Sequence, residues 1–318
     1  MKWPFSSKKQ RAPTEDIEKV GSHMVRINSI DFFGPYSESP NGKYLIGCQD
    51  SDRDRGIGGY RTEGKGRFVL TESDKVLFSK ECQRPTKGKT SNNGTVIVCD
   101  QLFGDQLDSK LLAYAVGGQK IIEHRFTANA YNNGISADGQ FAVVQLCNSD
   151  TDDGNKLSLF DLHKRTILNS FIPETGWANS YEFDPNNRIL SLCYRNGRSY
   201  RYSFDGGFLD SSRYQTERVE DANSTELVLI VQEKLKDTTS EDVDTLLSLL
   251  ERAYSEDLKK YPDYLALAHR LRGELYEMVG NAQRAIEAYR DALALNPKIG
   301  VKKKLLKLEK QFPRLPSA

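Results

Sequence analysis

The chain has 318 residues, of which 38% are hydrophobic, and its 45 Lys and Arg nearly balance its 44 Asp and Glu. This length and apolar content predict two globular domains, each with its own core. The near-zero net charge gives no electrostatic reason to expect a nucleic-acid or membrane partner. Because no window approaches the roughly 20 apolar residues of a bilayer span, and no signal-peptide core follows the N-terminal basic residues, we expect a cytoplasmic protein.

A four-residue turn signal recurs after a first segment, residues 1–24, that we expect to be flexible. The signal opens with Ser or Asp and ends in Asn-Gly, Asp-Gly or Asn-Asn, and its four copies are residues 39–42, 91–94, 136–139 and 184–187. The Gly and Asn residues supply the positive φ of a tight hairpin turn, and the apolar run after each turn predicts a buried strand. The copies start 45 to 52 residues apart, close to the period of four-stranded propeller blades.

The third copy continues with two more strand-like runs, residues 156–162 and 166–171, which make up most of a blade. The pattern resembles WD40-like β-propeller repeats, although the Gly-His and Trp-Asp dipeptides are missing and Phe160-Asp161 stands in the Trp-Asp position. The resemblance implies a mainly β, propeller-like domain of about four blades over residues 25–218. Either the ring is four-bladed, or it is an open arc that degenerate sequence or a second copy completes, the latter making a homo-oligomer.

The five cysteines form no C-x-x-C pair, which argues against a disulfide framework and a zinc site. We expect reduced, mostly buried thiols. Cys48, Cys99 and Cys193 end the apolar run after their turn, which we interpret as the first, inner strand of a blade, where small residues fit.

Two acidic loops invite comparison with calcium sites. Asp50, Asp52 and Asp54 alternate along the first loop, and residues 148–154 are similar. Hard oxygen ligands at this spacing suit calcium. However, the glycine of each loop comes one place late for an EF-hand, and Asp and Gly are common in solvated hairpin loops. The pattern favours a solvated loop, with calcium as the alternative.

Helical periodicity begins at Thr225, so residues 217–224 are the expected boundary and residues 219–318 an all-α domain. Residues 266–299 resemble one tetratricopeptide (TPR) repeat, although His269 and Arg272 replace two of its apolar residues; the matching positions are Gly273, Tyr276, Gly280, Ala285, Tyr289, Ala292 and Pro297. The resemblance implies protein or peptide binding, with a partner-facing first helix that presents Leu267, Arg270, Glu274 and Glu277.

Motifs that carry catalysis are missing from the sequence. The four histidines are isolated, and no Gly-x-Ser-x-Gly elbow or Walker-type loop is present. The sequence therefore predicts a non-enzymatic adaptor or scaffold that binds a protein or peptide through a propeller face and a TPR-like groove. The alternative is a propeller hydrolase or lyase with a dispersed, metal-dependent site.

Overall fold

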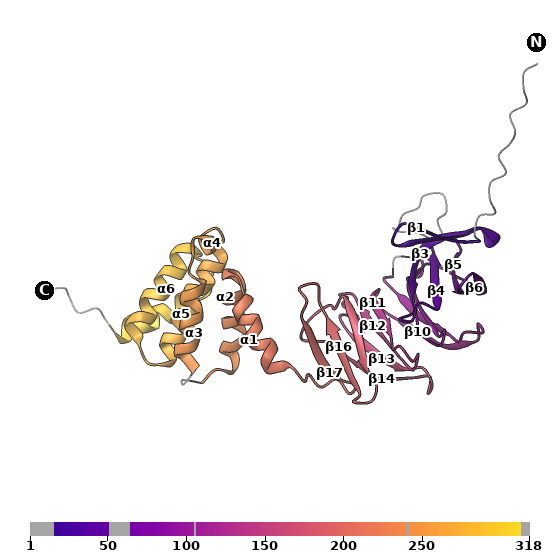
Figure 1. The fold of residues 1–318 in the computed structure, drawn as a ribbon. Coiled ribbons are helices and arrows are strands. Elements are labelled where there is room, and N and C mark those ends of the chain that lie inside the picture. The colour runs from indigo at the N-terminus through magenta and orange to yellow at the C-terminus, as the bar shows by residue number, and fades with distance from the viewer. Residues whose placement is uncertain (1–15, 51–63, 105, 240–241, 313–318) are drawn as a thin grey trace, which may run out of the picture. The chain divides into compact units, whose positions relative to one another are not determined.

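The computed structural model describes residues 16–50, 64–104, 106–239 and 242–312. The chain divides into two compact units, one ending at Ser211 and the other beginning at Ser212. Strands build the first unit and helices the second (Figure 1).

Four antiparallel sheets make up the strand unit, and each follows the previous one along the chain. The first has the order β1-β2-β3-β4-β5-β6, formed by Ile17–Val20, Met24–Ile27, Phe32–Glu38, Tyr44–Gln49, Gly66–Glu72 and Lys75–Cys82. The second has the order β10-β9-β8-β7, where β7 to β10 are Pro85–Thr90, Val96–Asp100, Ser109–Tyr114 and Lys120–Phe126. The third comprises β11 to β14, Ala130–Ile135, Phe141–Leu146, Leu157–Asp161 and Thr166–Phe171. The fourth comprises β15 to β17, Ser180–Asp184, Ile189–Cys193 and Ser199–Ser203.

One strand from each sheet lies at the inner edge of the stack. We call β3, β7, β11 and β15 the inner strands: β3 lies beside β7, β7 beside β11, and β11 beside β15. No comparable packing joins β15 to β3 in the described part of the unit. The four sheets therefore form an arc, which Figure 1 shows running from β4 and β10 through β11–β14 to β16 and β17.

The four predicted apolar runs are strands β4, β8, β12 and β16. In each sheet this strand lies next to the inner strand and is not the inner strand itself, so the interpretation of the cysteine-bearing runs as inner strands is corrected. Strands β8 and β12 are buried along their whole length because sheets pack on both of their faces. The inner strands are more polar, as in the sequence Pro-Thr-Lys-Gly-Lys-Thr of β7.

The repeated turns have a common geometry. In three of them the Ser Oγ donates to the side chain two residues later: Ser39 to Asn41 at 2.7 Å, Ser91 to Asn93 at 2.6 Å and Ser136 to Asp138 at 2.5 Å. The glycine that follows has a positive φ of 69°, 78° and 74° in turn. A side chain would strain this left-handed conformation, which glycine adopts freely. The prediction of positive-φ hairpin turns is confirmed for these three copies.

Both ends of the arc are covered or polar. On the first sheet, Val25, Ile27 and Phe32 pack against Leu45 and Val69 in one buried cluster. The β1–β2 hairpin thus covers the face that has no neighbouring sheet. Its first strand lies within the segment predicted to be flexible, residues 1–24, so the structure differs from that expectation from Ile17 onward. The segment is structured from Ile17 onward because its hairpin covers apolar side chains of the first sheet.

On the fourth sheet, the two faces differ in chemistry. Leu190, Leu192 and Tyr202 are buried on the face that meets the third sheet, where Tyr202 lies 5.4 Å from the ring of Phe171. The opposite face carries polar and charged side chains, among them Glu182, Ser191 and Arg201. A face of this composition does not need another sheet to cover it.

The helical unit consists of α1 to α7, formed by Ser211–Asp221, Ser224–Lys234, Val243–Ala253, Glu256–Lys259, Pro262–Met278, Ala282–Leu295 and Lys302–Gln311. The predicted boundary, residues 217–224, is helical as far as Asp221 and then supplies Asn223, whose side chain caps α2. Among the described residues no helix is both long and apolar enough to cross a membrane.

The α5–α6 pair depends on a small residue facing a large one. A Cβ at Gly273 would overlap the ring of Tyr289, which is fully buried. Gly280 ends the turn between the helices at φ +71°. The predicted close approach of two helices at Gly273 is confirmed.

Candidate binding surface on the inner strands

A bulge in β7 leaves Lys87 and Gly88 outside the regular pairing with β8. The register shifts between Thr86 and Lys89, and Lys87 has a φ of +47°. A Cβ at Gly88 would lie 2.8 Å from Cys48 Sγ, so glycine is required for β7 to approach β4. The bulge directs lysines to the inner edge of the sheets, as bulges next to sites often do.

A cation and two aromatic rings form a row across successive sheets. Lys87 Nζ lies 5.0 Å from the centre of the Tyr131 ring and donates to the Tyr131 carbonyl. The Tyr131 ring stacks on Trp177 with centroids 5.2 Å apart and an interplanar angle of 26°. Trp177 is 44% exposed. We call these three residues the Lys87–Tyr131–Trp177 row.

The loop that carries Trp177 is held on both sides by one buried side chain. Gln145 of β12 donates from Nε2 to the Gly176 carbonyl at 2.9 Å and accepts from the Ala178 N–H at 2.8 Å. Gln145 is fully buried, so these bonds are shielded from water. The tryptophan is therefore presented in a fixed position.

A pocket of about 130 Å³ lies beside the row and is lined by residues of β3, β4, β7 and β11. We call it the inner-strand pocket. Lys87 and Lys89 line it together with Ser37 and Asn132. Burial, followed by the charge of Lys87, lowers the pKa of Lys89. Side-chain amides and hydroxyls fix its walls, since Ser37 Oγ donates to the Gly88 carbonyl at 2.6 Å and Asn133 Nδ2 to the Lys87 carbonyl at 2.7 Å.

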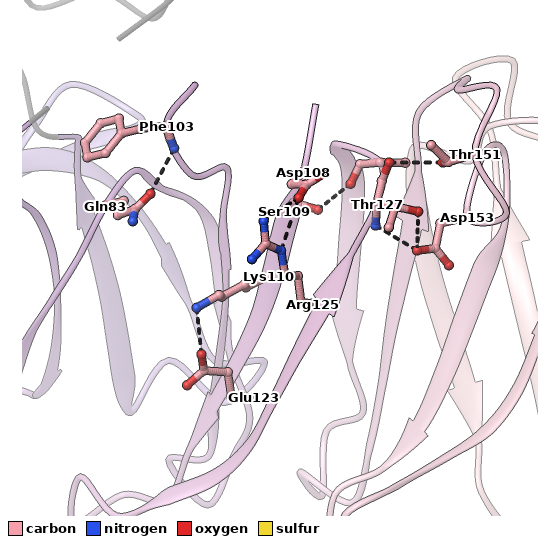
Figure 2. Close-up of polar contacts among 11 residues, drawn as sticks. Gln83, Phe103, Asp108, Ser109, Lys110, Glu123, Arg125, Thr127, Thr151 and Asp153 are labelled. Atoms are coloured by element: carbon pink, nitrogen blue, oxygen red, sulfur yellow. Dashed lines mark hydrogen bonds and ion pairs between the residues drawn. The ribbon is translucent and has the colours of Figure 1, made fainter. Parts of the chain in front are cut away.

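Figure 2 shows how the loop before β11 is fixed at the rim of the second and third sheets. The N–H and Oγ1 of Thr127 donate to Asp153 at 2.7 and 2.9 Å. On the other side, Arg125 pairs with Asp108 at 2.6 Å, and Ser109 Oγ donates to the Ala128 carbonyl. These contacts define where β11 begins, and thereby where Tyr131 is placed.

The titratable residues that the structure describes do not form a metal site. No three His, Cys, Asp or Glu residues there are grouped to hold a metal ion. His124 packs edge-on against Phe126 and Phe160, and burial lowers its pKa. His269 lies 3.7 Å from Asp291, and burial lowers its pKa as well.

The predicted calcium loop is described only in part. Asp50 lies 3.7 Å from Arg84, whereas Asp52 and Asp54 lie outside the described residues. In the second acidic loop, Asp153 is engaged by Thr127.

Of the four α5 residues predicted to face a partner, Arg270, Glu274 and Glu277 lie together beside α7, and Leu267 is partly buried elsewhere. Leu267 packs on the helical core. Lys304 of α7 pairs with Glu274 at 3.2 Å and with Glu277 at 3.6 Å. Arg270 lies 3.3 Å from Glu274.

The row and the pocket were not found by sequence reasoning. Lys87, Tyr131 and Trp177 are far apart in the chain, and only the stacking of the sheets unites them. Two local signals were available: the Lys-Gly-Lys sequence of residues 87–89, and a tryptophan, one of two in the chain, next to a glycine.

Comparison with known proteins gives structural similarity only. No family model and no curated protein matches the chain. Among solved structures, the β-propeller domain of Cps50 (Swd1) from Myceliophteria thermophila is 11% identical, with a TM-score of 0.35 over 52% of this chain and 49% of that one. The C-terminal WD40 domain of Sif2 is 14% identical, with a TM-score of 0.38 over 55% and 44%. Hsv2 from Kluyvelomyces marxianus is 7% identical, with a TM-score of 0.36 over 60% and 54%.

The chain spans about half the length of these three structures. Similarities this low carry no functional conclusion.

Proposed function

We propose that this protein is a non-enzymatic interaction scaffold of the cytoplasm that binds a protein or peptide partner on the inner strands. The observation that carries the proposal is the Lys87–Tyr131–Trp177 row. Exposed Trp and Tyr side chains are the residues that most often dominate binding energy at protein interfaces. Because Gln145 fixes the loop of Trp177, little conformational entropy is lost when a partner binds.

The finer architecture belongs to the same proposal. The four stacked sheets and their repeated turns support a WD40-like propeller of about four blades that stays open. The Gly273–Tyr289 contact supports a TPR-like helix pair with a second binding groove at Leu267, Arg270, Glu274 and Glu277. A partner that uses Glu274 or Glu277 must compete with Lys304, which pairs with both.

The alternative, a propeller hydrolase or lyase, lacks a supporting observation in the described part of the chain. The metal-dependent form of this alternative needs grouped His, Cys, Asp or Glu ligands, and no such group of three is found among the described residues.

The test compares three tagged full-length proteins in affinity purification followed by quantitative mass spectrometry. Wild type, Trp177→Ala and a matched control, Ile172→Ala, are compared; Ile172 is 61% exposed and precedes Trp177 in the same loop. We expect one reproducible partner with wild type and the control, and a loss of roughly 30-fold in affinity with Trp177→Ala, the size of an interface hot spot. Equal retention by all three proteins would contradict the proposal.

A further inference from the structure

Lys89 is a cation that has no counter-ion in the part of the chain that the structure describes. Its side chain is half-buried and lines the inner-strand pocket. Within the described residues no hydrogen bond or ion pair engages its Nζ. Most other lysines of the sheets differ in this respect, for example Lys110, which pairs with Glu123 at 2.8 Å. Partly buried ammonium groups are costly unless paired, so the pocket stabilises an incoming anion.

The surroundings of Lys89 are positive and contain no competing carboxylate. Lys87 lines the same pocket, and none of the described lining residues is acidic. Burial and, after it, the charge of Lys87 lower the pKa of Lys89. An anion placed between these groups would remove that penalty.

The number of free donors selects the kind of anion. Lys87 Nζ is held by the Tyr131 carbonyl and lies over the Tyr131 ring, whereas none of the N–H donors of Lys89 is used among the described residues, so Lys89 is the group that binds the carboxylate and Lys87 adds its charge nearby. A phosphate carries about two charges at neutral pH and is usually held by several donors or by a forked arginine, and no arginine lines this pocket among the described residues. A pocket of about 130 Å³ also suits one short side chain.

We infer that the partner segment carries an Asp or Glu whose carboxylate binds Lys89 in the inner-strand pocket while the flanking residues lie on the Lys87–Tyr131–Trp177 row. This inference rests on the proposed function, because it specifies the chemistry of the same partner. The aromatic row supplies affinity, and the lysine supplies selectivity for acidic sequences.

The experiment uses full-length protein and libraries of short peptides that are random except at one central residue. The central residue is Glu, Gln, phosphoserine or Ser, and oligothymidylate serves as a nucleic-acid probe. The proteins are wild type, Lys89→Met, Lys89→Arg, Trp177→Ala and the control Lys65→Met, whose lysine is 77% exposed and pairs with Glu81 on β6. Thermal unfolding of each variant confirms that it is folded.

We expect wild type and Lys65→Met to retain the Glu library about tenfold better than the Gln library, the size of one charge-assisted hydrogen bond. Lys89→Met loses this preference and Lys89→Arg keeps it. A wild-type protein that binds peptides without preferring Glu, or a preference that survives Lys89→Met, would overturn the inference and leave the proposed function standing. Stronger retention of phosphoserine peptides or of oligothymidylate would also overturn it. If wild type binds no library and Trp177→Ala also retains the partner in the affinity purification, the proposed function itself is overturned.

Discussion

The backbone N–H of Asn41 donates a 2.8 Å hydrogen bond to Oδ1 of Asn92, which joins the turn before β4 to the turn before β8. A similar link recurs one sheet further on, where the Asn92 N–H donates to the Ala137 carbonyl at 2.8 Å and Asn93 Nδ2 to the Asp138 carbonyl at 2.6 Å. Each of the first three repeated turns therefore reverses the chain and also binds the turn of a neighbouring sheet. The residues that close a hairpin help to set the spacing between sheets.

Substitutions at two glycines of these turns can distinguish chain reversal from the contact between neighbouring turns. Gly42 and Gly139 have φ values of 69° and 74°, so alanine strains both by about 1–2 kcal/mol. Only at Gly139 would the new Cβ also meet Asn93 Oδ1 and Ser91 Oγ, each at 2.7 Å, whereas nothing lies within 4 Å of it at Gly42. We expect Gly139→Ala to cost about 1–3 kcal/mol more than Gly42→Ala.

Urea denaturation of the full chain, followed by tryptophan fluorescence, measures this difference, because both tryptophans precede the helical unit. Equal destabilisation by the two substitutions would mean that the contact between turns contributes nothing.

In the helical unit, Gly273→Ala should reverse the usual effect of this substitution. Alanine in a helix interior normally stabilises by about 0.5–1 kcal/mol relative to glycine. Here the added methyl group would overlap the ring of Tyr289, so we expect a loss of about 1–3 kcal/mol. Far-ultraviolet circular dichroism during thermal unfolding measures it. The double variant Gly273→Ala/Tyr289→Leu should recover part of the loss, and a stabilised single variant would refute the close contact.

Features that depend on neighbours in sequence could be predicted. The hairpin turns at Gly42, Gly94 and Gly139 follow from local chemistry, and so does the helix contact between Gly273 and Tyr289, which lies within one pair of adjacent helices. The strands after the turns were also predicted, because they are apolar on both faces.

The order of strands within each sheet could not be predicted. Inner strands such as β7 are polar, and a sequence such as that of residues 85–90 does not show an alternating apolar pattern. The row at Lys87, Tyr131 and Trp177 was missed for a related reason: its residues come from different sheets, and only the packing of whole sheets brings them together. No spacing rule connects them.

Two buried thiols should be chemically protected. Burial raises the pKa of Cys48 to about 12 and that of Cys99 to about 11. A raised pKa keeps the neutral thiol in the folded protein where the unfolded chain already ionises, so both groups stabilise the fold fully below their ordinary value of 9.0 and progressively less as the pH rises from 9.0 towards about 12.

We expect iodoacetamide at about pH 8 to modify the half-buried Cys147 and Cys193 before Cys48 and Cys99. Mass spectrometry of peptides after timed labelling gives the order, and a sample in denaturant provides the rate of unprotected thiols. Labelling of Cys48 in the folded protein at that rate would contradict its burial.

The ends of the arc predict a protein that does not complete a ring with a second copy. The β1–β2 hairpin already buries the free face of the first sheet at Leu45 and Val69, and the free face of the fourth sheet presents Glu182 and Arg201. Terminal units of stacked repeats are capped in the same way, because an uncovered apolar face associates. We expect light scattering after size-exclusion chromatography to give the mass of one chain. Deletion of residues 1–15 should leave this mass per particle unchanged. Deletion of residues 1–28 removes the hairpin, uncovers apolar surface and should produce dimers or aggregates. A stable dimer of the full chain that persists on dilution would mean that another surface drives association.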